Sequence, residues 1–341
     1  MGKTFLMVVF PIILGTIAIA LMNVVRRYVM RSEAVSTLQF LTLYYTAATM
    51  VFGMVYIFFW GFTLPPKMLP GLWTAALGNA IVNVFIEFFE VKAASIDKGE
   101  VSLTAPLQAM TPGLITGLAL LLGEYPSRIG VTGIALMVAG SYVLLWERTP
   151  EHWYQYFGPI KRLLLLSKLG RLSREERNKT IVVTLAFGSA CMGTIGLLFD
   201  GLYTRRSLTM QGLILTCMGI VTFLAIVYAA WYLIRCDAKP TQRFCNCFRR
   251  ATIIPILVMG ILWVLHIVAI QPVFNQTFVG YVGTLKRFSI LISVVLGYYS
   301  FKEGDFKKRL WAAILIVAGA MLIASDDLPS KLSVKIVGLG F

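Results

Sequence analysis

The sequence predicts an all-α polytopic membrane protein with ten transmembrane helices, arranged as two inverted five-helix repeats. Three observations lead to this prediction. The 341 residues are 58% hydrophobic and only 14% charged, with a mean hydropathy of +0.78, which lies far outside the range of soluble domains. Apolar runs of membrane-spanning length recur along the whole chain. One pattern of apolar and polar residues occurs twice, once in each half.

The apolar runs define the expected spans. A helix needs roughly 20 apolar residues to cross about 30 Å of hydrocarbon. Five runs near this length occur in each half of the chain. The first carries no small-residue cleavage motif, so we expect a retained span and not a signal peptide. The ten runs are 4–25, 38–60, 72–94, 101–122, 131–145, 181–202, 208–234, 253–270, 278–300 and 310–324.

The internal repeat relates 101–145 to 280–324. Each copy has a long apolar run, a polar turn carrying Glu124 or Glu303, and a second apolar run with Val-Ala-Gly ending at Gly140 or Gly319. The two glutamates are 179 positions apart (303 − 124), about half the chain. An odd number of spans between equivalent points would invert the second copy relative to the first. We therefore expect a first repeat at 1–147, a linker at 148–180, a second repeat at 181–326 and a short tail at 327–341.

The charge of the chain indicates membrane topology and not nucleic-acid binding. The 31 Lys and Arg against 16 Asp and Glu give a net charge of +15. Most basic residues fall in loops on one side of the ten-span arrangement, and the positive-inside rule makes that side cytoplasmic, with both termini outside. The linker mixes aromatic, Leu and basic residues, which is typical of an amphipathic helix lying on the membrane surface.

Motifs for enzymatic chemistry are missing from the sequence. It contains no HExxH, GxSxG, Walker A or Gly-rich dinucleotide pattern, so we expect neither an enzyme nor a cofactor. Cys236, Cys245 and Cys247 share one loop. Three thiols without a nearby His are too few for a closed zinc site, so we expect no bound metal.

Span 72–94 carries a polar stripe. Asn79, Asn83, Glu87 and Glu90 follow a spacing that places them within about 80° of one another on a helix. In one interpretation they line a cavity with Glu87 as its ionisable centre. In the other, Glu90 lies near the interface and the two Asn residues hold helices together.

Two basic residues lie deep in span 278–300. Lys286 and Arg287 are adjacent, so their side chains diverge by about 100° on a helix and only one is expected to face the centre. A cation at that depth needs an acidic partner, for which Glu87 is the best-placed candidate, or an anionic substrate. Both interpretations remain open at the level of sequence.

Span 101–122 is interrupted by Pro106 and Pro112, and broken helices in corresponding segments point to binding sites in transporters. Asp200, His266 and Gln271 are weaker candidates, because a lone intramembrane His is more often packed and satisfied. Glu87 is the candidate proton carrier. The candidate substrate-binding residues are Asn79, Asn83, Glu87, Gln108, Thr111, Lys286, Arg287 and Ser289.

The chain resembles a known family in both halves. LTAPLQAMTPGLITGLALLLGEYPSRIGVTGIALMVAGSYVL resembles the end of the first half of an EamA-type transporter of the drug/metabolite transporter superfamily, and VGYVGTLKRFSILISVVLGYYSFKEGDFKKRLWAAILIVAGAMLI resembles the end of the second. The PLxxxTP, GE and VAG elements carry the likeness. It implies a ten-helix bundle with a central cavity and both termini in the cytoplasm, which conflicts with the charge distribution. It leaves the substrate open.

These observations together favour a secondary active transporter that moves a small polar or anionic metabolite by alternating access, with Glu87 coupling transport to a proton. We expect it in the bacterial cell inner membrane, with a small-molecule substrate and the lipid bilayer as partners, as a monomer or a homodimer. The alternative is a membrane-embedded enzyme or lipid-handling protein acting on a phosphate-bearing headgroup, and a third is a scaffold. An enzyme of this kind should gather its ionisable groups at one interface, whereas a transporter should hold them at mid-depth.

Overall fold

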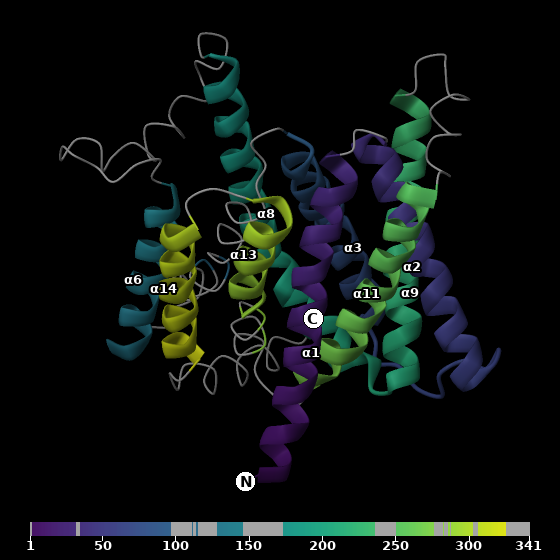
Figure 1. The fold of residues 1–341 in the computed structure, drawn as a ribbon. Helices are drawn as coiled ribbons and strands as arrows, with labels where there is room; N and C mark the ends of the chain where they lie inside the picture. The colour runs from purple at the N-terminus through teal and green to yellow at the C-terminus, as the bar shows by residue number, and fades with distance from the viewer. Residues whose placement is uncertain are drawn as a thin grey trace.

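The computed structural model describes residues 2–31, 35–96, 111, 114, 128–145, 173–235, 250–275, 282, 286, 288–302 and 306–324. Within these ranges all regular secondary structure is helical, and the helices run side by side in a bundle (Figure 1). The elements are α1 (Gly2–Arg31), α2 (Thr37–Trp60), α3 (Leu72–Ala94), α6 (Arg128–Leu145), α8 (Arg174–Ser207), α9 (Met210–Arg235), α11 (Arg250–Ile270), η3 (Gln271–Asn275), α13 (Phe288–Phe301) and α14 (Phe306–Ala324).

Long apolar helices make this an integral membrane protein of the all-α class, as the composition predicts. Six described segments are long and apolar enough to cross a membrane. The full set of ten spans remains a prediction: the fourth expected span lies outside the described residues except at Thr111 and Leu114, and the helices at the fifth, ninth and tenth, α6, α13 and α14, are not among the six. The six segments are Phe10–Arg31, Thr37–Trp60, Leu72–Ala94, Glu176–Ser207, Met210–Arg235 and Ile253–Asn275.

Local sequence signals set the helix ends. Ser36 caps α2: its hydroxyl accepts from the backbone N–H of Gln39, and the Gln39 side chain accepts in turn from the backbone N–H of Ser36, at 3.3 and 2.9 Å. The start of α3 follows Gly71, whose φ of 77° favours glycine. Arg206 at the end of α8 donates to the Gly71 carbonyl at 3.1 Å and so ties the start of α3 to α8.

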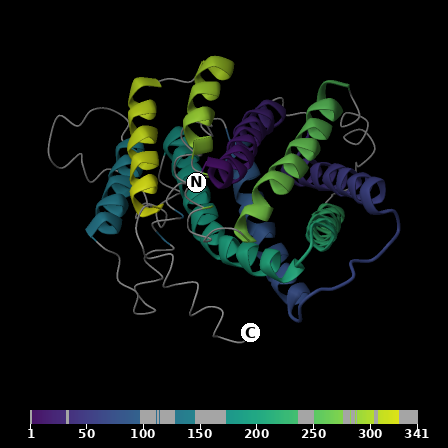
Figure 2. The ribbon, with the colours of Figure 1, turned by 90° about the horizontal axis from the view of Figure 1, so that it is seen from below.

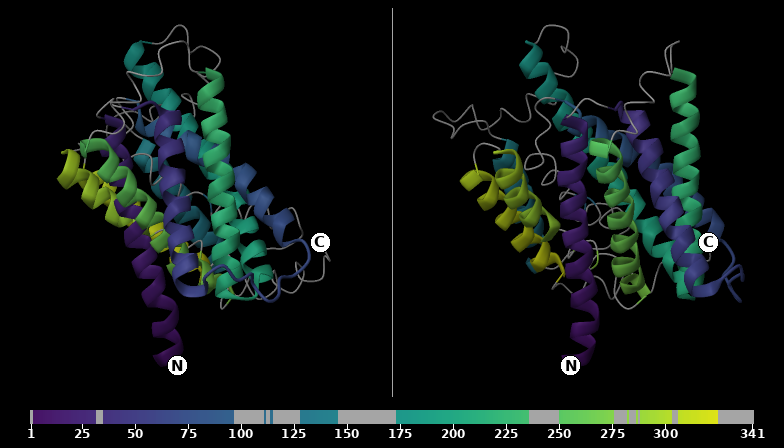
Figure 3. Two further views of the ribbon diagram at one scale, coloured as in Figure 1. Left: turned by 90° about the vertical axis from the view of Figure 1, so that its right-hand side faces the viewer. Right: turned by 45° about the vertical axis from the view of Figure 1, so that its right-hand side comes forward.

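Helices α3 and α8 run antiparallel and in close contact. Gly78 of α3 lies against the Phe199 ring, and Gly188 of α8 lies against Phe89 near the other end of the pair. We use the name basic end for the end of the bundle where α1 finishes at Arg31 and α3 finishes at Ala94. The other end, where α3 begins and α8 finishes, is called the opposite end. Seen along the bundle in Figure 2, α1 lies between α13 and α11, and the right-hand side view of Figure 3 also places it in the middle.

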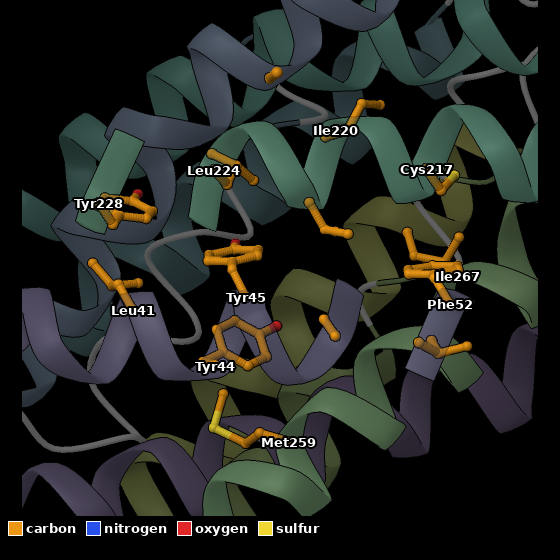
Figure 4. Close-up of a cluster of buried hydrophobic side chains, with 14 of the residues drawn as sticks. Leu41, Tyr44, Tyr45, Phe52, Cys217, Ile220, Leu224, Tyr228, Met259 and Ile267 are labelled. Carbon is orange, nitrogen blue, oxygen red and sulfur yellow. The ribbon is translucent and has the colours of Figure 1, made fainter. Parts of the chain in front are cut away.

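The main core lies between α2, α9 and α11. Tyr44 and Tyr45 of α2 lie side by side, with Leu224 of α9 on one side and Met259 of α11 on the other (Figure 4). Tyr45 stacks on Tyr228 of α9 with ring centroids 5.8 Å apart. These large side chains are almost fully buried, so they fix the spacing of three helices.

Helices α6 and α14 form a separate antiparallel pair at one edge of the bundle (Figure 1). A Cβ built on Gly140 of α6 would lie 2.8 Å from the carbonyl oxygen of Ala312 in α14. A Cβ built on Gly319 of α14 would lie 2.5 Å from the carbonyl oxygen of Gly133 in α6. Each helix therefore uses a glycine to bring its backbone against the other, as small residues do between membrane helices.

Candidate functional site

The polar stripe predicted in span 72–94 is present on α3 and joins two clusters of buried charge. Asn79 is 2% exposed and Glu87 8%. Asn83 lies between them and donates to the Asn79 side-chain oxygen at 2.8 Å. Glu90 extends the stripe toward the basic end. At 1.5 Å of rise per residue the stripe from Asn79 to Glu90 spans about 16 Å, roughly half of the hydrocarbon thickness.

The cluster nearer the basic end centres on Arg26 of α1. Its guanidinium donates to Glu87 Oε2 at 3.1 Å and also contacts Glu90 Oε2. Ser189 of α8 donates to the other oxygen of Glu90 at 3.1 Å. The side chains of Arg26, Glu87 and Glu90 are 6, 11 and 15% exposed, so the charges are shielded from water and need hydrogen bonds within the protein.

The neighbouring Arg27 has a different task. Its guanidinium donates to the carbonyl oxygens of Ala94 and Ile96, at the C-terminal end of α3, the second at 3.0 Å. Carbonyls at a helix C-terminus carry partial negative charge and lack partners inside the helix. Arg27 therefore fastens the end of α3 to α1, whereas Arg26 serves the carboxylates.

Tyrosine hydroxyls surround the Arg26 cluster. Tyr44 and Tyr45 lie close to Glu87: the Tyr45 hydroxyl is beside its carboxylate, and the Tyr44 hydroxyl is buried with no hydrogen-bond partner in the described part of the chain. Arg26 Nε is likewise buried and unpartnered there. Tyr228 donates to the carbonyl of Val84 at 2.6 Å. Buried polar atoms without partners are uncommon in folded proteins, so each of them needs a physical explanation.

The second cluster lies toward the opposite end and pairs Asp200 of α8 with Lys286. Lys286 Nζ is 3.7 Å from Asp200 Oδ2, and the side chains are 14 and 21% exposed. Asn79 donates to Asp200 Oδ1 at 3.0 Å and to the carbonyl of Gly196 at 3.2 Å. The stripe on α3 is thus bonded to the second cluster as well as to the first.

Residues of η3 complete this cluster. The Lys286 ammonium lies 5.2 Å from the ring centroid of Phe274, a cation–π distance. Gln271 is 1% exposed and accepts from the Thr204 hydroxyl at 2.9 Å, and its amide group also lies beside the Asp200 carboxylate. Ser289 is buried and donates to the Lys286 carbonyl at 2.7 Å, so it shapes the turn that presents Lys286.

The expected pairing of Glu87 with Lys286 was wrong, and Arg287, the other expected partner, lies outside the described residues. Glu87 pairs with Arg26, and Lys286 pairs with Asp200. Because the first apolar run ends at residue 25, the sequence predicts that Arg26 lies in a loop. In the structure α1 continues to Arg31, which places Arg26 more than one turn inside the helix.

The remaining predicted site residues are placed in part. Thr111 is buried and donates to the carbonyl of Ala190 in α8 at a long 3.4 Å, close to Gly193. Gln108 and Arg287 lie outside the described residues, as do the three loop cysteines and most of the linker. No cluster of His, Cys, Asp and Glu able to hold a metal occurs among the residues that were described.

Comparison with known proteins shows the fold and nothing finer. No protein-family model and no curated protein matches the sequence. Among solved structures 25 chains match. One, described only as "Crystal structure of protein", superposes with a TM-score of 0.61 at 16% identity, covering 94% of this chain and 98% of the other. At that identity the likeness concerns the fold alone, over nearly the whole of both chains.

Proposed function

We propose that this protein is a secondary active transporter that moves a small polar or anionic metabolite by alternating access, on the ten-helix scaffold of an EamA-type transporter. The observation that carries the proposal is the position of the two charge clusters. They lie at different depths, one between α1 and α3 and the other between α8 and Lys286, and the α3 stripe connects them. Buried charge distributed along the bundle is typical of a path across a membrane.

The helix packing supports an inverted repeat. Helix α3 packs on α8, and α11 packs on α1, so the third helix of each expected half contacts the first helix of the other. In the pair α6 and α14, Gly140 lies against the carbonyl oxygen of Ala312. Gly319 lies against the carbonyl oxygen of Gly133 in the equivalent way. All of these pairs obey the 179-residue offset of the sequence repeat. Reciprocal contacts between equivalent residues are what a two-fold axis between repeats produces.

In this mechanism the two clusters act as gates. Arg26 bridges α1 to α3 near the basic end, and Lys286 bridges to α8 nearer the opposite end. Opening either side requires its bridge to separate. The Lys286–Asp200 distance of 3.7 Å exceeds a hydrogen bond, so a substrate anion can contact the ammonium more closely than Asp200 does.

The headgroup-enzyme alternative is less well supported. It needs the ionisable groups together at one interface, where phosphate lies, whereas these groups form two clusters about half a membrane thickness apart. We further propose a location in the bacterial cell inner membrane with the basic end toward the cytoplasm, because exposed basic residues such as Arg31 and Arg174 lie at that end.

A ligand screen followed by a flux measurement tests the proposal. Purified protein is heated with a panel of amino acids, small carboxylates and phosphorylated metabolites, since a ligand of the folded state raises the melting temperature. Ligands found in this way are then tested for counterflow in proteoliposomes. We expect counterflow to fall about tenfold or more in Lys286→Met, a loss of ~1.4 kcal/mol of binding.

Lys67→Met is the matched control, because Lys67 is exposed and outside both clusters. Its counterflow should equal that of the wild type. A panel compound that binds and is chemically converted without crossing the membrane would instead establish the enzyme alternative.

A further inference from the structure

We propose that Arg26, Glu87 and Glu90 form a binding site for one proton, shared between the two carboxyl groups. The two carboxylates face one guanidinium, so the three side chains carry a net charge of −1 when both carboxyls are ionised and are neutral when one of them holds a proton. All three are at least four-fifths buried, and burial disfavours an uncompensated charge.

The other charged groups near these carboxyls leave that balance unchanged. Arg27, the next basic residue on α1, donates to the C-terminal carbonyls of α3. From α8 comes Ser189, from α2 Tyr44 and Tyr45, and from α9 Tyr228, all of them neutral side chains. Lys92 on α3 itself is exposed. Among the residues that the structure describes, the cation bound directly to the carboxylates is therefore Arg26.

The unpartnered atoms around the cluster provide a second, independent indication. The hydroxyl of Tyr44 and the Nε of Arg26 are buried and without hydrogen-bond partners in the described residues, and the buried Tyr45 hydroxyl lies beside the Glu87 carboxylate. When a proton neutralises one carboxyl, the guanidinium needs to bind the other alone. The tyrosine hydroxyls and the free Nε then supply donors for the rearranged pair at no additional desolvation cost.

In this arrangement both carboxyls are required for the proton to bind. If either is replaced by an amide, the other pairs one-to-one with Arg26 and the cluster is neutral without a proton. Both Glu87→Gln and Glu90→Gln should therefore abolish proton binding by themselves, whereas a conventional single-carboxyl site depends on one residue only. In the transport mechanism proposed above, proton binding would weaken the bridge from α1 to α3 and so open the basic end.

Infrared difference spectroscopy on purified protein measures the proton directly. Between weakly acid and alkaline pH, exposed carboxyls with pKa values of about 4 stay ionised, so the carbonyl band of a protonated carboxyl reports buried groups. We expect a band from this site in the wild type and its loss in Glu87→Gln and in Glu90→Gln, whereas any band from Asp200, the other buried carboxyl described, is common to all of these proteins. Glu176→Gln is the control: Glu176 is exposed on α8, and Gln also serves its capping role, so the band should persist.

Size-exclusion profiles and helical circular dichroism verify that the variants are folded. If an amide variant does not fold, Glu87→Asp and Glu90→Asp replace it, because they keep the carboxyl group. Each of them should shift the frequency of the carbonyl band. A carbonyl signal that keeps its wild-type intensity in both amide variants, or is reduced in only one of them, overturns the shared site. The infrared titration needs no substrate, so it tests the proton site separately from transport. A carboxyl band without counterflow would reject the transporter and keep the proton site. Counterflow without the band would reject the proton site and keep the transporter.

Discussion

Gly140 of α6 and Gly319 of α14 hold equivalent positions in one helix pair. A Cβ on the first would lie 2.8 Å from the carbonyl oxygen of Ala312, and one on the second 2.5 Å from that of Gly133. Backbone atoms form both contacts, so they cannot move aside as the end of a side chain can. The two helices must separate if either glycine gains a side chain.

We therefore expect Gly140→Ala and Gly319→Ala to destabilise the protein by similar amounts, about 2 kcal/mol each, as overpacking does. Gly53→Ala is the control. A Cβ at Gly53 would meet only the Met218 sulfur at 3.9 Å, so the substitution should be neutral or stabilising. Thermal unfolding in detergent compares the three variants. A loss confined to one of the paired glycines would contradict the equivalence of their contacts.

The pair was foreseeable from sequence, and other relationships were not. The 179-residue repeat selected Gly140 and Gly319 as equivalent, and the 3.6-residue period placed Asn79, Asn83 and Glu87 on one face of α3. Periodicity describes one helix at a time, however. It says nothing about which helix lies opposite, so the partners Arg26 and Asp200, both far away in sequence, were missed.

The length of an apolar run does not set the end of a helix, and α1 is an example. Crossing the hydrocarbon needs about 20 residues, and the first apolar run ends at 25, so Arg26 counted as a loop residue. The helix is 30 residues long and carries Arg26 into the bundle. The signal available in the sequence was weak: helix-forming residues continue without Gly or Pro as far as Arg31.

Removing Arg26 should be severe because it leaves two buried carboxylates without their cation. Arg26→Leu is expected to cost about 3 kcal/mol or more of unfolding free energy. Adding Glu87→Gln and Glu90→Gln to that variant should recover most of the loss, since no buried charge then remains unpaired. Arg31→Leu, an exposed arginine of the same helix, should change stability by less than about 0.5 kcal/mol. Denaturant titrations of the four proteins test this, and failure of the triple variant to recover would argue against charge pairing as the cause.

The two asparagines of the stripe should differ. Asn79 donates to Asp200 and to the backbone of α8, whereas the hydrogen bonds described for Asn83 stay within α3. Asn79→Ala should therefore cost about 1–3 kcal/mol, the penalty for leaving buried groups unsatisfied, and Asn83→Ala clearly less. Melting temperatures of the two variants give the comparison, and an equal or inverse order would mean that Asn79 does not hold the second cluster together.

The positive-inside rule predicts that the basic end faces the cytoplasm. In a variant whose native cysteines are replaced, Arg174→Cys at the basic end should be protected from an impermeant thiol reagent in intact cells, because the positive-inside rule places it in the cytoplasm. Lys67→Cys, at the opposite end and exposed, should react readily. The inverse labelling pattern would put both termini in the cytoplasm, as the family resemblance implies.

Accessibility of the middle of the α3 stripe tests alternating access most directly. Asn83 lies between the two charge clusters and is half-buried. In proteoliposomes, Asn83→Cys should react with an impermeant charged thiol reagent added from either side, because each gate opens in turn. Leu77→Cys, which faces outward on the same helix, should react from neither side since lipid covers it. Reaction of Asn83→Cys from one side only would contradict the transporter and indicate a site open to a single interface.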